Sequence, residues 1–171
     1  MAEKESSRPD GIDVVSIVTP NHLHVPIAKI FAEKGIHIIC DKPIGMSSEE
    51  AIDLKKIIES KKLIFALTHN YTGYPMVRHA KSLVQKGDLG SLRVIQAEYP
   101  QDWLTTKAED SGLKQAEWRT DPNRSGVGGC IGDIGTHAYN LIRFITGLEA
   151  VSYTHLRAHE TKANRVCRLR R

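Results

Sequence analysis

An aspartate and a histidine four residues apart, Asp133 and His137, are the residues best suited to chemistry in this chain of 171 residues. Residues at this spacing share one face of a helix, so the carboxylate and the imidazole can act on one small molecule. A lysine, Lys42, follows closely on an apolar run that ends at Cys40. Open α/β sheets place their ligand-facing groups at the carboxyl ends of such strands. An acid, an imidazole and an ammonium together suit the interconversion of a hydroxyl group and a carbonyl group.

Three short apolar runs predict the strands of a sheet that could present these groups. They cover residues 12–18, 36–40 and 63–67, and their continuous apolar character is typical of strands buried on both faces. Segments with helical spacing separate them. This alternation predicts a parallel sheet with right-handed crossovers.

The helices between these strands have recognisable ends. Asn21 can cap the first helix, and Gly35 marks its end. Ser47 and Glu50 form a capping-box pattern ahead of the second helix. The apolar stripe expected for the first helix consists of Leu23, Ile27, Ile30 and Phe31.

A second group of elements follows the third strand. Pro75 suits the first turn of a helix that ends at Gly87. Residues 92–99 predict another strand, whereas residues 100–125 are polar and irregular. Residues 129–145 then predict a helix that carries Asp133 and His137 beside an apolar stripe. The residues of that stripe are Ile134, Ala138, Leu141, Ile142 and Ile145.

Three motifs, in this order along the chain, resemble those of a known family. They are Thr19-Pro20-Asn21-His22-Leu23-His24, Asp41-Lys42-Pro43 and the glycine-rich run from Gly128 to His137. The sequence is similar to the Gfo/Idh/MocA oxidoreductases, which are NAD(P)-dependent enzymes that act on sugars and polyols. In the family's Glu-Lys-Pro element, Asp41 stands here in place of the glutamate.

The resemblance implies an α/β protein in two parts. Residues 1–73 correspond to the C-terminal half of a Rossmann-type parallel sheet. Residues 74–150 correspond to the start of an α+β substrate domain with an open, mainly antiparallel sheet. No Gly-x-Gly-x-x-Gly precedes the first strand, and residues 126–132, which resemble that pattern only superficially, follow a loop instead of a strand. We therefore expect the phosphate-binding loop to be missing and the 171 residues alone to bind dinucleotide weakly.

The last 21 residues, 151–171, are expected to be a non-native tail. Residues 151–161 resemble the translation of a transposase-type sequencing adaptor, and such segments are excluded from fold reasoning. The tail contains six of the 24 Lys and Arg residues and one of the 20 Asp and Glu residues. Without it, 18 basic and 19 acidic residues remain, a net charge of −1. A nucleic-acid partner, which needs a basic face, therefore has little support.

The family resemblance also implies roles for the three candidate catalytic residues. Lys42 is expected to lie near the nicotinamide and the reacting hydroxyl. His137 is expected to act as general base in alcohol oxidation, because imidazole titrates near physiological pH. Asp133 is expected to bind a neighbouring hydroxyl and to orient the base. Taken alone, Lys42 would be a solvated lysine at a strand end, and the other two would be a pair that caps a helix.

Further residues are expected to bind the cofactor and the substrate. The cofactor-binding candidates are Thr19, Pro20, Asn21, His22, Asp41, Lys42, Pro43, Asn70, Trp118 and Arg119. The substrate-binding candidates are Lys42, Tyr99, Asp102, Trp103, Asp133 and His137. Helix capping is the alternative for Asn21, and packing with a surface ion pair is the alternative for Trp118 and Arg119. His24 is expected to do no chemistry.

These observations predict a dehydrogenase that acts on the CH–OH group of a sugar, inositol or other polyol, with NAD or NADP as cofactor. The alternatives are an NAD-dependent glycoside hydrolase of the same fold and a non-catalytic ligand-binding protein. Cys40, Cys130 and Cys167 lie far apart and predict neither a disulfide framework nor a metal site. The sequence shows no signal peptide and no long apolar run. A cytoplasmic protein that binds a small molecule, without a membrane partner, is therefore expected, and the family resemblance implies a homo-oligomer.

Overall fold

The computed structural model of the chain describes residues 1–102 and 105–152. It contains two compact units. Unit 1 comprises residues 1–68 and 118–127, and unit 2 comprises residues 69–117 and the chain from residue 128 onward. Residues 118–127 therefore pack with the first part of the chain and not with their neighbours in sequence. Trp103 and residues 153–171 of the predicted tail lie outside the described residues.

Unit 1 is built on a parallel three-stranded sheet, as the sequence predicts. Its strands are β1 (Val14–Ile17), β2 (His37–Cys40) and β3 (Phe65–Leu67), in the order β1-β2-β3. Ile17 pairs with Cys40, and Cys40 pairs with Leu67, so the three strands end level with one another. The residues that follow each strand therefore lie along a single edge of the sheet.

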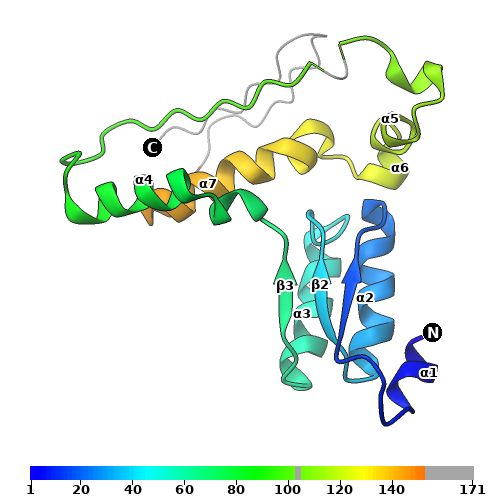
Figure 1. Ribbon diagram of the computed structural model, residues 1–171. Helices are drawn as coiled ribbons and strands as arrows, with labels where there is room; N and C mark the ends of the chain where they lie inside the picture. Colours follow the sequence, from blue (N-terminus) through cyan, green and yellow to red (C-terminus); the bar gives the residue numbers. More distant parts are fainter. Residues whose placement is uncertain (103–104, 153–171) are drawn as a thin grey trace. The chain divides into compact units, whose positions relative to one another are not determined.

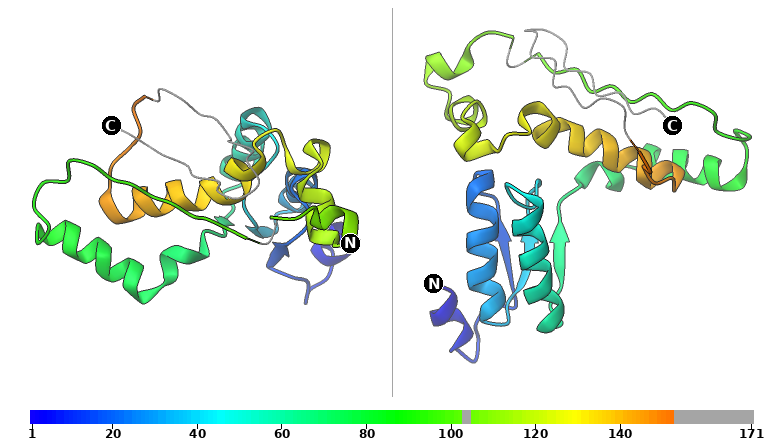
Figure 2. Two further views of the ribbon diagram at one scale, coloured as in Figure 1. Left: turned by 90° about the horizontal axis from the view of Figure 1, so that it is seen from above. Right: turned by 180° about the vertical axis from the view of Figure 1, so that it is seen from behind.

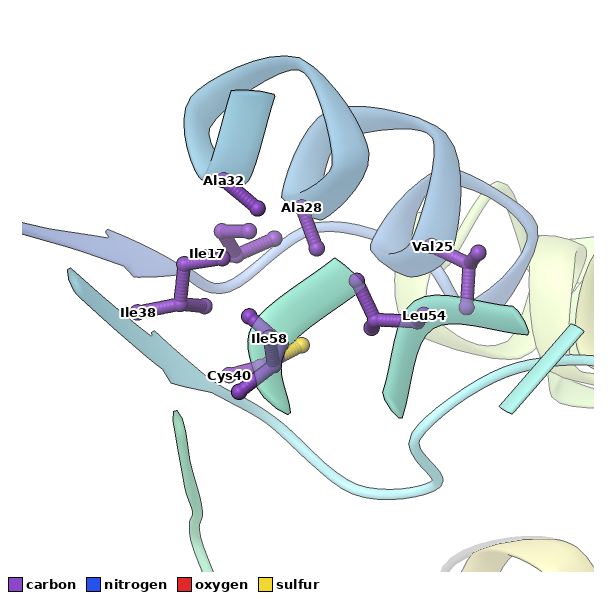
Figure 3. Packing of buried hydrophobic residues seen from close by; sticks show 8 residues of the cluster. All are labelled: Ile17, Val25, Ala28, Ala32, Ile38, Cys40, Leu54 and Ile58. Carbon is purple, nitrogen blue, oxygen red and sulfur yellow. The ribbon is translucent and has the colours of Figure 1, made fainter. Parts of the chain in front are cut away.

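Two helices, α2 (His24–Glu33) and α3 (Ser48–Ser60), cover the same face of this sheet (Figures 1 and 2). The buried core lies between them and the strands (Figure 3). Its members are Ile17, Val25, Ala28, Ala32, Ile38, Cys40, Leu54 and Ile58. Because alternate residues of a strand point to opposite faces, the residues between these core positions point away from the helices.

The strands are not buried on both faces, contrary to the sequence prediction. Val14 and Ile39 are 47% and 38% exposed, because both helices pack on the other side of the sheet. The predicted stripe of α2 also needs correction, since Ile30 is 57% exposed. A 3-10 turn, η1 (Asn21–Leu23), precedes α2, and the helix turns Ala28 and Ala32 towards the sheet. These small side chains allow the helix to approach the strands closely.

Two further features of unit 1 are a short helix that was not predicted and a capping box that was. The polar start contains a short helix, α1 (Ala2–Ser6), in which Ala2 is buried against Phe31 and Ile36. The capping box ahead of α3 is confirmed, because the backbone N–H of Glu50 donates to Ser47 Oγ at 3.3 Å.

Unit 2 contains two helices that lie side by side (Figures 1 and 2). One is α4 (Pro75–Lys86), which starts at Pro75 and ends at Gly87 in the left-handed conformation, as predicted. The other is α7 (Thr136–Thr146), and Lys81 Nζ of α4 lies 4.1 Å from the centre of the Phe144 ring of α7. A 3-10 turn, η2 (Asn70–Gly73), leads into α4, and a π-helical turn, η4 (Ile131–Gly135), leads into α7.

The strand predicted over residues 92–99 is absent from the described structure. The segment runs without secondary structure, and Val94 is 84% exposed, because no described segment pairs with it. The segment predicted to be irregular contains three short helices instead. They are η3 (Ala108–Ser111), α5 (Lys114–Arg119) and α6 (Pro122–Ser125). Within the described ranges, every helix is too short or too polar to span a bilayer.

The capping box of α3 provides a test of the fold. Replacing Ser47 with Ala removes the hydroxyl that accepts from the Glu50 N–H, and we expect it to lower the free energy of unfolding by about 1 kcal/mol. Ser48→Ala is the matched control, because the Ser48 hydroxyl contacts only the exposed Glu49 carboxylate. Urea denaturation should show a change within about 0.5 kcal/mol for the control. Equal losses for both variants would contradict the assignment of the cap.

Candidate active site

The carboxyl edge of the sheet in unit 1 is tied together by hydrogen bonds beyond the strands themselves. The backbone N–H of Asp41 donates to the carbonyl of Ile17 at 3.0 Å, and that of Thr68 donates to the carbonyl of Cys40 at 2.9 Å. The hydroxyl of Thr68 donates to Asp41 Oδ1 at 2.7 Å. The shorter acid of the Asp41-Lys42-Pro43 motif thus joins the ends of β2 and β3, directly before Lys42.

A buried histidine joins the segments that follow β1 and β2. The ring of His24 is 1% exposed, with Nδ1 2.7 Å from the carbonyl oxygen of Pro43 and Nε2 2.8 Å from that of Thr19. The peptide bond between Lys42 and Pro43 is cis. Sequence reasoning gave His24 no chemical role, and the structure gives it a structural one. The signal was available, since His24 and Ala28 are four residues apart and share the buried face of α2.

Two polar groups at this edge differ in what they can do. Thr19 Oγ1 is buried and has no hydrogen-bond partner among the described residues. A buried hydroxyl of this kind is costly unless it is satisfied, so it fits contact with a polar group of a bound cofactor. The Cys40 thiol has its pKa raised to about 12, first by burial and second by the charge of Asp41. Cys40 is therefore no thiolate nucleophile near neutral pH.

Asn21 and His22, both predicted to bind the cofactor, hold the returning segment 118–127 in unit 1. Asn21 Nδ2 donates to the carbonyl of Ser125 at 2.8 Å, and His22 Nδ1 lies 3.2 Å from the carbonyl of Arg124. The side chain of Asn21 makes no capping bond to α2, so the capping alternative was wrong. Arg124 and Ser125 belong to α6, whose N-cap Asp121 accepts from the Asn123 N–H.

Trp118 and Arg119 belong to the same returning segment. The guanidinium carbon of Arg119 lies 4.2 Å from the centre of the Trp118 ring, a cation–π geometry. Both side chains are half-buried. Their contact with the cofactor stays a prediction, as do the cofactor contacts of Thr19, Pro20, Asn21, His22 and Pro43.

Asp133 and His137 lie in unit 2, on the π-helical turn and at the start of α7. A π turn is wider than an α turn and occurs often at functional sites. In this wider turn, residues four apart lie one almost directly above the other. His137 is 6% exposed, although it stands on a helix of which no other polar residue is buried. The turn therefore presents the carboxylate and the imidazole on one side, as the spacing predicts.

A tyrosine that sequence reasoning missed, Tyr71, contacts both His137 and Tyr99. The Tyr71 ring centre lies 4.5 Å from that of His137 and 5.9 Å from that of Tyr99, with which it is stacked. The hydroxyls of Tyr71 and Tyr99 are 2.9 Å apart and share a hydrogen bond. His69 meets the His137 ring edge to face at 5.7 Å. His69 and Tyr71 follow β3 directly, and that position at a strand end was the signal for both.

The environment of Tyr71 keeps its phenol neutral. The hydrogen bond with Tyr99 raises the pKa of Tyr71 to about 12, and burial and the nearby Asp133 carboxylate add to the effect. A neutral phenol beside His137 can donate a hydrogen bond over the whole physiological range.

The remaining candidate residues are exposed in unit 2, belong to unit 1 or lie outside the described residues. Asn70 and Asp102 are exposed in unit 2, and Trp103 lies outside the described residues. Lys42 is half-buried in unit 1. Its action together with Asp133 and His137 stays a prediction. In the described ranges, no group of three or more His, Cys, Asp or Glu residues is arranged to hold a metal ion.

Comparison with known proteins identifies the family. Residues 2–69 match the oxidoreductase family with an NAD-binding Rossmann fold, and residues 77–166 match the GFO/IDH/MocA C-terminal domain. The chain belongs to the Gfo/Idh/MocA oxidoreductases. The second match extends beyond Ala150 into the segment predicted to be a tail, and the non-native origin of that segment stays a prediction.

Three relatives illustrate the similarity of this Gfo/Idh/MocA chain. It is 37% identical to levoglucosan dehydrogenase of Pseudarthrobacter phenanthrenivorans, over 80% of this chain and 33% of the relative. A crystal structure of an inositol dehydrogenase homolog with NAD+ from Azotobacter vinelandii matches with a TM-score of 0.81 and 30% identity, over 85% of this chain and 37% of that one.

The third relative is an oxidoreductase from Sinorhizobium meliloti, whose crystal structure matches with a TM-score of 0.71 and 48% identity. The match covers 87% of this chain and 36% of that one. The chain thus spans little more than a third of the length of these relatives.

The phenol of Tyr71 provides a test of the cluster. A pKa raised in the folded state favours the protonated form, so the stability it gives is complete below about pH 10 and is lost as the pH rises through about 12. Tyr71→Phe should remove the phenol that titrates near 12 from the ultraviolet spectrum of tyrosinate formation. In this variant, the free energy of unfolding should also fall less steeply between about pH 10 and about pH 12 than in the unchanged protein.

Tyr139→Phe is the matched control, because Tyr139 lies on α7 outside the Tyr71–Tyr99 hydrogen bond. The late-titrating phenol should persist in this variant. Its persistence in Tyr71→Phe would contradict the assignment.

Proposed function

We propose that the full-length protein containing this chain transfers hydride between the CH–OH carbon of a sugar, inositol or related polyol and NAD or NADP. The observation that carries the proposal is the cluster around Tyr71, whose ring lies against His137 and whose hydroxyl shares a hydrogen bond with Tyr99, in a member of this family. Relatives support the substrate class, because they include a levoglucosan dehydrogenase and an inositol dehydrogenase homolog complexed with NAD+.

His137 acts as the general base in the oxidation direction. As the C–H hydride leaves the substrate carbon, the hydroxyl proton passes to the imidazole, and the hydroxyl becomes a carbonyl. In reduction, the imidazolium returns that proton. Burial of the ring between Tyr71 and His69 limits its rotation, so the nitrogen that takes the proton is held in one direction.

Asp133 and Lys42 assist in different ways. The carboxylate of Asp133 accepts a hydrogen bond from a hydroxyl next to the reacting one and so fixes the substrate's orientation. The ammonium of Lys42 stabilises the negative charge that develops on the reacting oxygen. Tyr99 and Asp102 bind further hydroxyls, since sugars need both donors and acceptors.

The residues at the sheet edge would hold the cofactor. The nicotinamide ring supplies the acceptor for the hydride when it is bound. The unsatisfied hydroxyl of Thr19 and the motif Asp41-Lys42-Pro43 lie where open α/β sheets bind ligands. We also propose a homo-oligomeric, cytoplasmic protein, as the family resemblance implies, with a reducing compartment supported by the free thiols of Cys40 and Cys130.

Turnover by the full-length protein tests the proposal. NADH or NADPH formation should be measured with levoglucosan, inositols and simple sugars. We expect turnover with at least one of them, and a loss of kcat of about a hundredfold to ten-thousandfold in His137→Asn, because the proton has no acceptor. Lys42→Met should also lower kcat.

The control variant is His79→Asn, since His79 is exposed on α4 and should leave kcat unchanged. Glycoside cleavage without net cofactor reduction would replace the proposal with a glycoside hydrolase. Cofactor binding without turnover on any substrate would favour a non-catalytic ligand-binding protein.

A further inference from the structure

We propose that His24 is a positioning residue whose ring carries protons on both nitrogens, and that these two N–H groups hold the Lys42–Pro43 segment against the segment that follows β1. The proposal goes beyond the catalytic assignment, because His24 touches neither substrate nor cofactor in that scheme. The positioning role of His24 rests on the proposed function. The number of protons on its ring does not depend on that function.

The partners of the ring decide its protonation. Nδ1 lies 2.7 Å from the carbonyl oxygen of Pro43, and Nε2 lies 2.8 Å from the carbonyl oxygen of Thr19. A carbonyl oxygen accepts hydrogen bonds and donates none. A neutral imidazole has one N–H, so its other nitrogen would place a lone pair against a carbonyl lone pair. Only the ring with two N–H groups satisfies both contacts, and both distances fall in the range of charge-assisted hydrogen bonds.

Burial makes the alternative costly. His24 is 1% exposed, so no water can insert to relieve a mismatched nitrogen at either carbonyl. With a neutral ring, one of the two carbonyl oxygens would also be left without a donor. Buried backbone oxygens at the end of a strand need a hydrogen-bond donor.

A second histidine of unit 1, His37 on β2, provides an internal reference. His37 Nδ1 accepts a hydrogen bond from the backbone N–H of Ile64 at 3.1 Å. That nitrogen therefore carries no proton. The structure thus assigns opposite states to His24 and His37 from partner chemistry alone.

The position of His24 explains what the two hydrogen bonds accomplish. Pro43 directly follows Lys42, and Thr19 carries the unsatisfied hydroxyl assigned to the cofactor. The next residue of α2, Val25, approaches Gly45 so closely that a Cβ added there would lie 2.7 Å from its methyl group. The first turn of α2 therefore holds the Lys42 segment at two points, and His24 supplies the polar one. Fixing the backbone beside Lys42 fixes where its ammonium can reach.

Nitrogen-15 NMR of the ligand-free, full-length protein tests the proton count. With histidine labelled in the ring and assigned through His24→Gln and His37→Gln, we expect two protonated nitrogens for His24 at neutral pH. His37 should show one protonated and one unprotonated nitrogen in the same spectrum. An unprotonated nitrogen on His24 would overturn the proposal.

A double-mutant cycle tests the positioning role. His24→Gln can satisfy at most one of the two carbonyls through its amide, so we expect kcat to fall about tenfold to a hundredfold. In a Lys42→Met background, the same change should cost less than about threefold, because the group that His24 positions is gone. Equal losses of kcat in both backgrounds would show that His24 supports the fold and does not position Lys42.

His37→Gln is the matched control and should leave kcat unchanged, since its amide oxygen can still accept from Ile64. The two proposals also fail separately. If Lys42→Met alone leaves kcat unchanged, the proposed catalytic role of Lys42 fails, while the NMR result still decides the state of the His24 ring.

Discussion

Backbone carbonyls buried at the ends of parallel strands must find hydrogen-bond donors, and in this protein side chains supply them. His24 serves the carbonyls of Thr19 and Pro43, while Asp41 and Thr68 join the ends of β2 and β3. These bonds cross between segments that the sheet itself does not connect. The edge that carries Lys42 is therefore rigid before any ligand arrives, and this is what a proton-transfer or charge-stabilising group requires.

The cluster in unit 2 follows the same logic with aromatic rings. Tyr71 stacks on Tyr99, shares its hydroxyl hydrogen bond and lies against His137. The imidazole is consequently held by packing on two sides, and Asp133 lies on the π turn that leads into α7. Each unit thus places its candidate residues at the point where an element begins or ends, beside side chains that hold them in position.

The elements with strong local signals could be predicted from the sequence. The parallel strands, the capping box at Ser47 and the helix from Pro75 to Gly87 depend on short-range patterns, and all were confirmed. The strand over residues 92–99 was wrong because a strand exists only with a neighbour to pair with. The stripe of α2 was wrong at two of its four residues, because Leu23 belongs to the preceding 3-10 turn and Ile30 is exposed.

The candidate site, like the fold, could be predicted only in part from the sequence. The spacing of Asp133 and His137 predicts that both groups share one helix face, because it depends only on helix geometry; Asp133 lies on the π turn and His137 at the start of α7, and their joint action stays a prediction. Tyr71 escaped notice because its role comes from contact with Tyr99, 28 residues away in sequence. The structural role of His24 was missed because its partners are backbone carbonyls, which carry no sequence signature. The position of each residue, after a strand or on a buried helix face, was a signal, but the partners it would contact left no local pattern.

A crystal structure of the full-length protein with NADH and a bound polyol tests the central claim most directly. The account predicts that the ammonium of Lys42, the imidazole of His137 and the carboxylate of Asp133 all contact the substrate, with His137 at the hydroxyl of the carbon nearest the nicotinamide. A substrate that contacts none of the three, or three groups that face separate cavities, would contradict it.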